Sequence, residues 1–286
     1  MEKFSFSKLI EEFNLGNLEI SLLSNNEKIN SHVFKVKYMD SFYVLKLLKK
    51  ISITQINLIL EVLNKISDLN TPKLEFSEVI EDDGNKNLFN LILVFEYIDG
   101  VKCFDFDENL NFLKEFYKNT KRINLDEYLD LNFFFKFEEI LKYLEQPLKS
   151  KVQEILDKLS RESNFRVILA DINTSNSIKR NLDVKFYYFD FEEVLIGDIY
   201  WDLAYFYVDL YQENLLENSS FSEFEYKLKK HNFLELFNLE NSLEKYCLQN
   251  DEKFNNYLIL VLLYKSVQEC QENKEIYLKN LEKLLI

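Results

Sequence analysis

The chain has 286 residues, of which 47% are hydrophobic and 15% aromatic, and its formal net charge is −14. So many apolar residues can bury a sizeable core, which argues against a disordered protein and favours one two-lobed domain or two modest domains. Because nucleic-acid binding usually needs a basic field, the acidic charge disfavours a nucleic-acid partner. The charge is consistent with attraction of cationic substrates or with solubility alone.

The cysteines and the apolar runs give an expected location. Cys103, Cys247 and Cys270 lie far apart with no C-x-x-C spacing, which predicts a reducing, cytoplasmic environment. The N-terminal residues lack the basic flank of a signal peptide, so none is expected. Residues 257–264 form the most apolar run, which is far shorter than the roughly 20 residues that span a bilayer. We therefore expect a buried helix there and no membrane span.

The first hundred residues contain patterns of both strands and helices. A polar, Gly-free segment at 24–31 separates the first two expected strands, and Ser52 or Thr54 is the expected cap of the main helix. Residues 101–166 and those after 206 are expected to be mostly helical. We predict strands at residues 18–23, 33–37, 42–48, 73–80 and 88–97, a short amphipathic helix at 4–14 and a longer helix at 51–66.

Lys46 lies inside the apolar run YVLKLL of an expected strand. Burial of an unpaired ammonium is costly, so this lysine either pairs with an anion or extends to solvent from an edge strand. Glu61 is the only acidic residue in the expected helix at 51–66, which makes it the predicted partner, although an ordinary solvated glutamate is the alternative. The expected strand at 88–97 runs into EYIDG, a sequence that suits a hinge whose backbone groups pair with an adenine edge.

Three polar residues near the middle of the chain have a spacing that suits phosphoryl transfer. Asp171 is followed five residues later by Asn176, and Asp190 comes after an expected hairpin. In kinase-like enzymes the first Asp orients and deprotonates the accepting hydroxyl, while the Asn and the second Asp hold magnesium. Asp198 and Asp202, in the helical pattern that follows, are interpreted as structural, and Asp202 is expected to bind the backbone of the catalytic loop.

Three motifs carry a family resemblance. They are LADINTSN at residues 169–176, FDFEE at 189–193 and GDIYWDLA at 197–204. With these motifs the chain resembles the aminoglycoside phosphotransferase and choline kinase superfamily, small-molecule kinases with a protein-kinase-like fold. The resemblance covers residues 18 to about 211. It departs from the family pattern where Leu169 and Ala170 replace the usual His and Gly.

The resemblance implies an α+β, bilobal protein-kinase-like fold. Residues 1–96 would form a lobe with a small antiparallel sheet and residues 97–286 a mostly helical lobe. ATP and Mg²⁺ are the implied cofactors. The roles that it implies are Asp171 as the catalytic base, Asn176 and Asp190 as magnesium ligands, Lys46 as a phosphate contact paired with Glu61, and Glu96, Tyr97 and Ile98 as the adenine-binding hinge.

The function that the resemblance implies is phosphorylation of a hydroxyl group on a small metabolite. The acceptor stays open among an amino alcohol such as choline or ethanolamine, an aminoglycoside, a sugar and an amino acid; carboxylates and aromatic rings would suit an amine. Candidate acceptor contacts, named only because they lie close to the motifs and with structural roles as the alternative, are Glu192, Glu193, Trp201 and Tyr205.

Two other functional classes compete with this one. The Gly-free segment at 24–31 and the loss of the loop His motivate a catalytically impaired, kinase-like nucleotide-binding or scaffold protein. A protein kinase is disfavoured because the Asp190-Phe191-Glu192 triplet lacks the usual Gly and no activation segment separates it from the next helix. Nothing in the sequence indicates an oligomeric state.

Overall fold

The computed structural model describes residues 19–26, 31–38, 40–82, 84–103, 105–173, 175–210 and 251–268, together with Leu281. The predicted helix at 4–14, residues 27–30 of the segment at 24–31 and all residues from 211 to 250 lie outside this part. The chain divides into two compact units. Unit 1 comprises Met1–Val101 and Ile178–Glu192, and unit 2 comprises Lys102–Ser177 and Glu193–Ile286. The lobe boundary between residues 96 and 97 stays a prediction.

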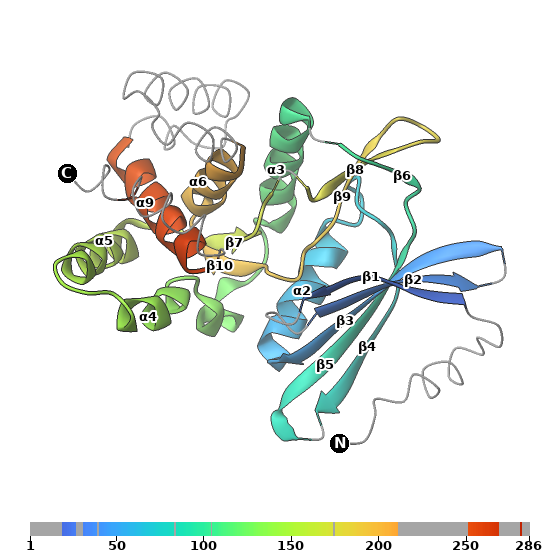
Figure 1. The fold of residues 1–286 in the computed structure, drawn as a ribbon, viewed down its shortest axis with the longest axis horizontal. Helices are drawn as coiled ribbons and strands as arrows, with labels where there is room; N and C mark the ends of the chain where they lie inside the picture. The colour runs from blue at the N-terminus through green and yellow to red at the C-terminus, as the bar shows by residue number, and fades with distance from the viewer. Residues whose placement is uncertain are drawn as a thin grey trace. The chain divides into compact units, whose positions relative to one another are not determined.

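Unit 1 is built on a five-stranded sheet in the order β1-β2-β3-β5-β4, in which each neighbouring pair is antiparallel (Figure 1). This confirms the predicted strands in their predicted order. The side chain of Ser52 accepts a hydrogen bond from the Gln55 N–H, which confirms one of the two caps proposed for the helix α2. The elements are β1 (Glu19–Asn26), β2 (Ser31–Tyr38), β3 (Ser41–Ile51), α2 (Ile53–Lys65), β4 (Leu74–Asp82) and β5 (Asn85–Glu96).

The two faces of β3 have different surroundings. Leu45 and Leu47 pack with Val36 and Ile92 into a small core on one face of the sheet. Because side chains alternate between the faces of a strand, Lys46 points to the other face. The helix α2 packs against β5 and buries five of its apolar residues. The sheet thus fixes the direction in which the Lys46 ammonium is presented.

A second, three-stranded sheet has the order β6-β8-β9. The strands β8 (Ser177–Arg180) and β9 (Phe186–Tyr188) lie between Asn176 and Asp190, where the hairpin is predicted. The strand β6 (Gly100–Lys102) runs so close to β8 that a Cβ at Gly100 would lie 2.3 Å from the Lys179 carbonyl oxygen. Only glycine fits at this position without movement of the backbone.

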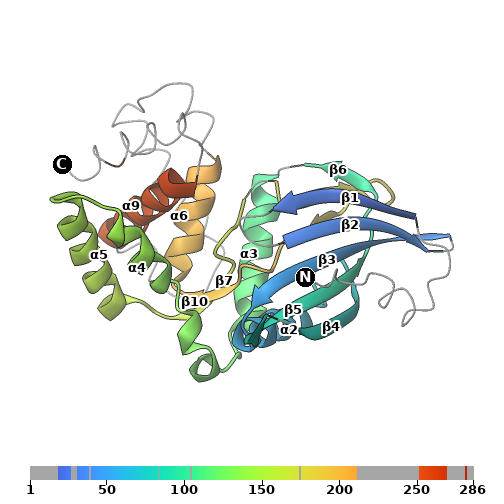
Figure 2. The same ribbon diagram turned by 60° about the horizontal axis from the view of Figure 1, so that its bottom comes forward.

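In the residues that the structure describes, unit 2 is mostly helical, with one pair of short antiparallel strands, β7 and β10. The helices α6 and α9 lie side by side, and α4 and α5 pack against α9 (Figures 1 and 2). In the part of the chain that the structure describes, no helix is long and apolar enough to cross a membrane. The elements are α3 (Phe106–Thr120), two short 3-10 helices (Leu125–Glu127 and Leu129–Leu131), α4 (Phe135–Lys142), α5 (Leu148–Glu162), β7 (Arg166–Ile168), β10 (Leu195–Gly197), α6 (Ile199–Leu210) and α9 (Asp251–Gln268).

The core of unit 2 is an aromatic cluster around Trp201 of α6. The Trp201 side chain is buried, and its ring centroid lies 5.2 Å from that of Phe133 and 5.8 Å from that of Phe137. Tyr264 of α9 meets the same indole edge-on at 5.6 Å. Aromatic pairs at such distances pack tightly and favour defined geometries. This cluster therefore fixes α6, the helix that bonds to the loop before Asp171.

Candidate active site

The loop after β7 carries Asp171, and α6 holds the two residues before it. The carboxylate of Asp202 accepts hydrogen bonds from the backbone N–H groups of Leu169 (2.8 Å) and Ala170 (2.9 Å). The indole Nε1–H of Trp201 donates to the Ala170 carbonyl oxygen at 2.9 Å. The predicted contact of Asp202 with the loop backbone is confirmed. These three bonds fix the peptide groups that lead into Asp171.

Ala170 has a left-handed backbone, with φ of 64°. A residue with a Cβ pays about 1–2 kcal/mol in this conformation, whereas glycine does not. Ala170 stands where the motif of the resembled superfamily has Gly. The bonds from Asp202 and Trp201 hold it in place, so the loop keeps a glycine-type conformation without glycine.

Asp171 itself is contacted by Tyr205, one turn after Trp201 on α6. The Tyr205 hydroxyl and the Asp171 carboxylate form a side-chain hydrogen bond. Burial raises the pKa of Tyr205 far above its ordinary value and the Asp171 carboxylate raises it further, so the phenol stays neutral and donates. Trp201 and Tyr205 were named from the sequence only for their closeness to the motifs; their spacing of four, which puts them on one face of a helix, could have indicated this arrangement.

Asn176 closes the same loop. Its side-chain Nδ2 donates to the Asp171 backbone carbonyl at 3.3 Å. The amide oxygen therefore points away from this bond and can serve another ligand. An amide oxygen is among the ligands that hard cations such as Mg²⁺ accept, so Asn176 fits its predicted role.

Asp202 is buried completely and carries a perturbed acidity. Besides the two backbone N–H groups, it accepts a hydrogen bond from the Tyr117 hydroxyl at 2.8 Å. Burial raises the pKa of the Asp202 carboxyl to about 6, and the nearby Asp171 carboxylate adds to the rise. The three hydrogen bonds oppose it, because they stabilise the ionised form.

Asp198 has a separate, structural role at the start of α6. Its carboxylate accepts hydrogen bonds from the backbone N–H groups of Asn164 (2.9 Å) and Tyr200 (3.0 Å). The Lys253 ammonium of α9 binds the same carboxylate at 2.7 Å. This agrees with the prediction that Asp198 is structural, since it ties α9 and the end of α5 to the first turn of α6.

In unit 1, Lys46 pairs with two carboxylates of the segment that follows β9. Its ammonium forms an ion pair with Asp190 and lies 2.7 Å from Glu192. These are its ion pairs within the described residues, and the predicted pair with Glu61 is not among them. The Gln55 side chain of α2 donates instead to the Glu192 backbone carbonyl at 3.3 Å. The helix α2 thus supports the Lys46 cluster through Gln55.

The surroundings of this cluster raise the pKa of both Lys46 and Glu192, which favours the charged lysine but disfavours the charged glutamate. Burial by itself would lower the pKa of Lys46, but the carboxylates of Glu192 and Asp190 outweigh it and raise the pKa. The ammonium therefore stays charged. Burial raises the pKa of Glu192, and the neighbouring Asp190 carboxylate adds to that rise because the two acids share one cation.

Asp190 also has a left-handed backbone, with φ of 80°. Its side chain is 32% exposed, against 10% for Lys46. Asp and Asn tolerate this region better than most residues, and strained backbone of this kind gathers at functional sites. A partly exposed carboxylate oxygen suits the role of magnesium ligand that the sequence predicts for Asp190. In the described part of the chain, no cluster of three or more His, Cys, Asp or Glu residues could hold a metal ion.

The predicted hinge residues follow β5. The N–H groups of Glu96 and Tyr97 donate to the carbonyls of Lys73 (2.9 Å) and Phe42 (3.2 Å), and the Glu96 carboxylate accepts from the Lys73 N–H at 3.0 Å. Ile98 is buried. The role of Glu96, Tyr97 and Ile98 in holding adenine stays a prediction.

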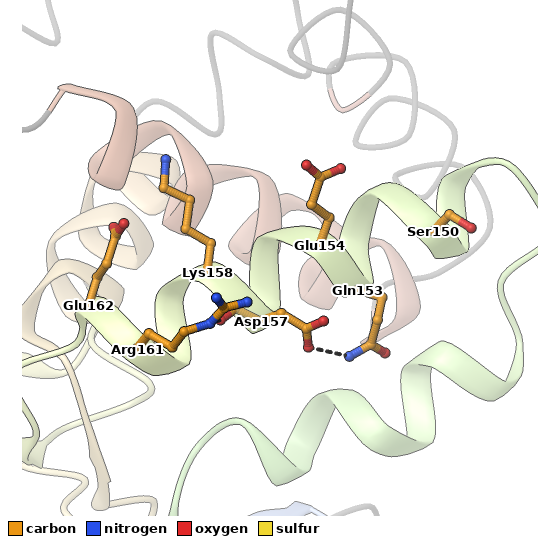
Figure 3. A pocket seen from close by; sticks show the side chains of 7 residues that line it. All are labelled: Ser150, Gln153, Glu154, Asp157, Lys158, Arg161 and Glu162. Atoms are coloured by element: carbon orange, nitrogen blue, oxygen red, sulfur yellow. Dashed lines mark hydrogen bonds between the residues drawn. The ribbon is translucent and has the colours of Figure 1, made fainter.

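A hollow of about 480 Å³ lies elsewhere in unit 2, on the outer side of α5 (Figure 3). It is lined by charged and polar side chains of this single helix, and Gln153 and Asp157 bond to each other within it at 2.8 Å. None of the predicted site residues lines it. We therefore assign it no part in catalysis.

Comparison with protein-family models and with curated protein sequences finds no match. Comparison with solved structures does find matches over nearly the whole chain. An amicoumacin kinase, hAmiN, in complex with AMP-PNP, Ca²⁺ and Ami has a TM-score of 0.68 at 16% identity, covering 98% of this chain and 93% of that one. The chain shares the α+β, kinase-like fold of this small-molecule kinase. The resemblance predicted from the motifs is thereby confirmed at the level of the fold.

Two further solved structures share this kinase-like fold. A thermostable mutant of aminoglycoside phosphotransferase APH(4)-Ia, in ternary complex with ADP and hygromycin B, has a TM-score of 0.59 at 13% identity and covers 99% of this chain and 98% of its own. The ethanolamine kinase of Plasmodium vivax has a TM-score of 0.58 at 16% identity, with 98% and 86% covered. At identities this low, structural similarity establishes the kinase-like fold alone, and the activity has to be argued from the site residues.

Proposed function

We propose that the chain is an ATP- and Mg²⁺-dependent phosphotransferase that acts on the hydroxyl group of a small metabolite. The observation that carries the proposal is the setting of Asp171. Its loop is fixed by Asp202 and Trp201, and its carboxylate is held by Tyr205. A carboxylate held at a set orientation is what proton abstraction from an incoming hydroxyl requires.

The predicted residues divide the chemistry among them. Asp171 orients the acceptor hydroxyl and takes its proton as the oxygen attacks the terminal phosphorus of ATP. Lys46 is charged and stabilises phosphate oxygens. Asn176 and Asp190 offer the oxygen ligands that Mg²⁺ prefers, and the metal supplies neutralisation of phosphate charge. Glu96, Tyr97 and Ile98 remain the predicted contacts of the adenine, with the Ile98 N–H as donor.

The acceptor class is supported only in outline. The solved structures with this fold include an ethanolamine kinase and a phosphotransferase bound to hygromycin B, so amino alcohols and amino sugars head the candidates. The proposal therefore covers a hydroxylated amine in general. A cytoplasmic location fits the predicted reducing environment.

Release of ADP from ATP and Mg²⁺, measured over a panel of amines, aminoglycosides, sugars and amino acids, tests the proposal. With the best acceptor, Asp171→Asn is expected to lower kcat by about 100- to 10,000-fold, the usual contribution of a general base. Asp130→Asn, which changes an exposed aspartate of the same unit, is the control and should leave the rate unchanged.

Two results would contradict the proposal. Full turnover in Asp171→Asn would remove the assigned base. Binding of ATP, seen as a thermal shift, with no turnover on any acceptor would favour the nucleotide-binding scaffold, for which the Gly-free segment at 24–31 is the motivating feature.

A further inference from the structure

A second ion pair in unit 2 has no part in the chemistry proposed so far. The Lys136 ammonium of α4 lies 2.9 Å from the carboxylate of Glu193, two residues before β10. The side chains are 27% and 24% exposed, so most of each is covered while an outer part stays accessible. The carboxylate of Glu193 and burial act on the pKa of Lys136 in opposite directions, and the net result is a raised pKa. The ammonium is thus permanently charged.

A chain of contacts joins this pair to the predicted base. Lys136 Nζ lies 3.5 Å from the Tyr264 hydroxyl and 5.4 Å from the centre of its ring. Tyr264 packs on Trp201, whose ring centroid lies 6.1 Å from that of Tyr205, and Tyr205 bonds to Asp171. Burial raises the pKa of Tyr264, Lys136 lowers it, and the carboxylates of Glu193 and Asp171 raise it, so all three charged groups act on one phenol. The ion pair and the base therefore belong to one cluster.

A purely structural role would not need charges at this place. Covering an ion pair costs desolvation energy, and apolar residues of the same size often serve stability as well. The same helix carries a second pair, Lys142 with Glu139, whose side chains are 61% and 70% exposed and stay in water. A covered pair with accessible outer atoms acts strongly on any charge brought next to it, because solvent screens it less.

The two charges have bonding capacity left for a ligand. The ammonium of Lys136 has three N–H donors, and the carboxylate of Glu193 has two oxygens, so the bond between them uses only part of each. An acceptor with an ammonium alone would meet repulsion from Lys136, and one with a carboxylate alone would meet repulsion from Glu193. A ligand that carries both charges satisfies both partners.

We propose that Lys136 and Glu193 recognise a zwitterionic acceptor, a hydroxylated amino acid. Lys136 binds its carboxylate, Glu193 binds its ammonium, and its side-chain hydroxyl faces Asp171. This inference rests on the proposed phosphotransferase function. The hydroxyl oxygen forms a bond to the terminal phosphorus of ATP, the bond from that phosphorus to the ADP oxygen breaks, and the hydroxyl proton passes to Asp171.

Two matched sets of acceptors test the inference by ADP release. The first is serine, ethanolamine, which lacks the carboxylate, and 3-hydroxypropanoate, which lacks the amine. The second is homoserine with 3-aminopropan-1-ol and 4-hydroxybutanoate. At least one amino acid is expected to exceed both of its truncated analogues in kcat/KM by about 100-fold, because each analogue leaves a covered charge without its partner.

Variants of the pair then assign the charges. Lys136→Met should raise KM for the amino acid by about 100-fold and leave kcat/KM for the amino alcohol unchanged or higher, whereas Lys136→Arg should retain the preference. Lys142→Met, on the same helix, is the control and should match the wild type. If Lys136→Met does not fold because Glu193 is left unpaired, the double variant with Glu193→Gln should show the loss of preference.

Three results would overturn the inference. The first is an equal kcat/KM for the amino acid and its analogues. The second is an equal loss of kcat/KM on all acceptors in Lys136→Met. The third is no ADP release from either set of acceptors. The last result leaves the phosphotransferase proposal intact if another acceptor of the wider panel supports turnover that Asp171→Asn abolishes. The two proposals therefore fail separately.

Discussion

Replacement of Asp202 by alanine removes a carboxylate that accepts three hydrogen bonds in the core of unit 2. Two donors are the backbone N–H groups of Leu169 and Ala170, in the loop before Asp171, and the third is the Tyr117 hydroxyl. Each buried donor left without a partner costs about 1–3 kcal/mol. Removal of the buried charge returns about 3 kcal/mol at neutral pH, the cost that corresponds to the rise of the pKa from 3.8 to about 6. We expect Asp202→Ala to lower the free energy of unfolding by about 3 kcal/mol in net terms.

Urea unfolding at pH 7.5, followed by circular dichroism, measures this loss. Tyr117→Phe removes one of the three bonds and should cost about 1 kcal/mol. Because the loop before Asp171 loses its anchors, kcat should fall in Asp202→Ala more than in Tyr117→Phe. A loss of stability below about 1 kcal/mol in Asp202→Ala would refute the reasoning, since it would mean that the loop N–H groups find other partners.

The same residue predicts a pH dependence of stability. The pKa of Asp202 is raised in the folded protein, so the folded state holds this proton more tightly than the unfolded chain does. The stabilisation is therefore full below about pH 4 and is lost as the pH rises through 6, by about 3 kcal/mol in total. Asp202→Asn cannot titrate, so the difference in stability between wild type and this variant should shrink over that window. A difference that grows with pH would show that the hydrogen bonds outweigh burial.

Two further substitutions probe the loop and the phosphate contact. Ala170→Gly removes a Cβ from a left-handed residue, so the free energy of unfolding should stay the same or rise by up to about 1 kcal/mol. Ala204→Gly inside α6 is the comparison and should lower the free energy of unfolding by about 1 kcal/mol or more. Equal losses of stability in thermal unfolding would contradict backbone strain at Ala170. Lys46→Met should raise KM for ATP by at least about 10-fold, because it removes the charge that is predicted to bind phosphate. Lys118→Met, in an exposed ion pair, is the control and should leave KM unchanged. An unchanged KM in Lys46→Met would contradict the predicted phosphate contact.

The sequence by itself determined the elements and the order of the motifs. The pattern of apolar residues located the strand that contains Lys46, and Ser52 marked the start of α2. The spacing of Asp171, Asn176 and Asp190 gave the resemblance that the fold then confirmed, and Asp202 was recognised as the anchor of the loop. The strand and cap signals are readable because they depend on residues within a few positions of one another, whereas the roles of Asp190 and Asp202 followed from the order and spacing of the motifs.

Only the tertiary structure decided which side chains meet. Lys46 pairs with Asp190 and Glu192, which lie 144 and 146 positions further along the chain, and not with the nearby Glu61 that its strand and helix suggested. The bond of Trp201 to the Ala170 carbonyl and the pair of Lys136 with Glu193 are of the same kind. Local sequence propensity does not encode these pairings, because the burial of a side chain and its possible partners are set only when distant segments pack together. A buried charged side chain then forms an ion pair with the oppositely charged group that packing brings next to it.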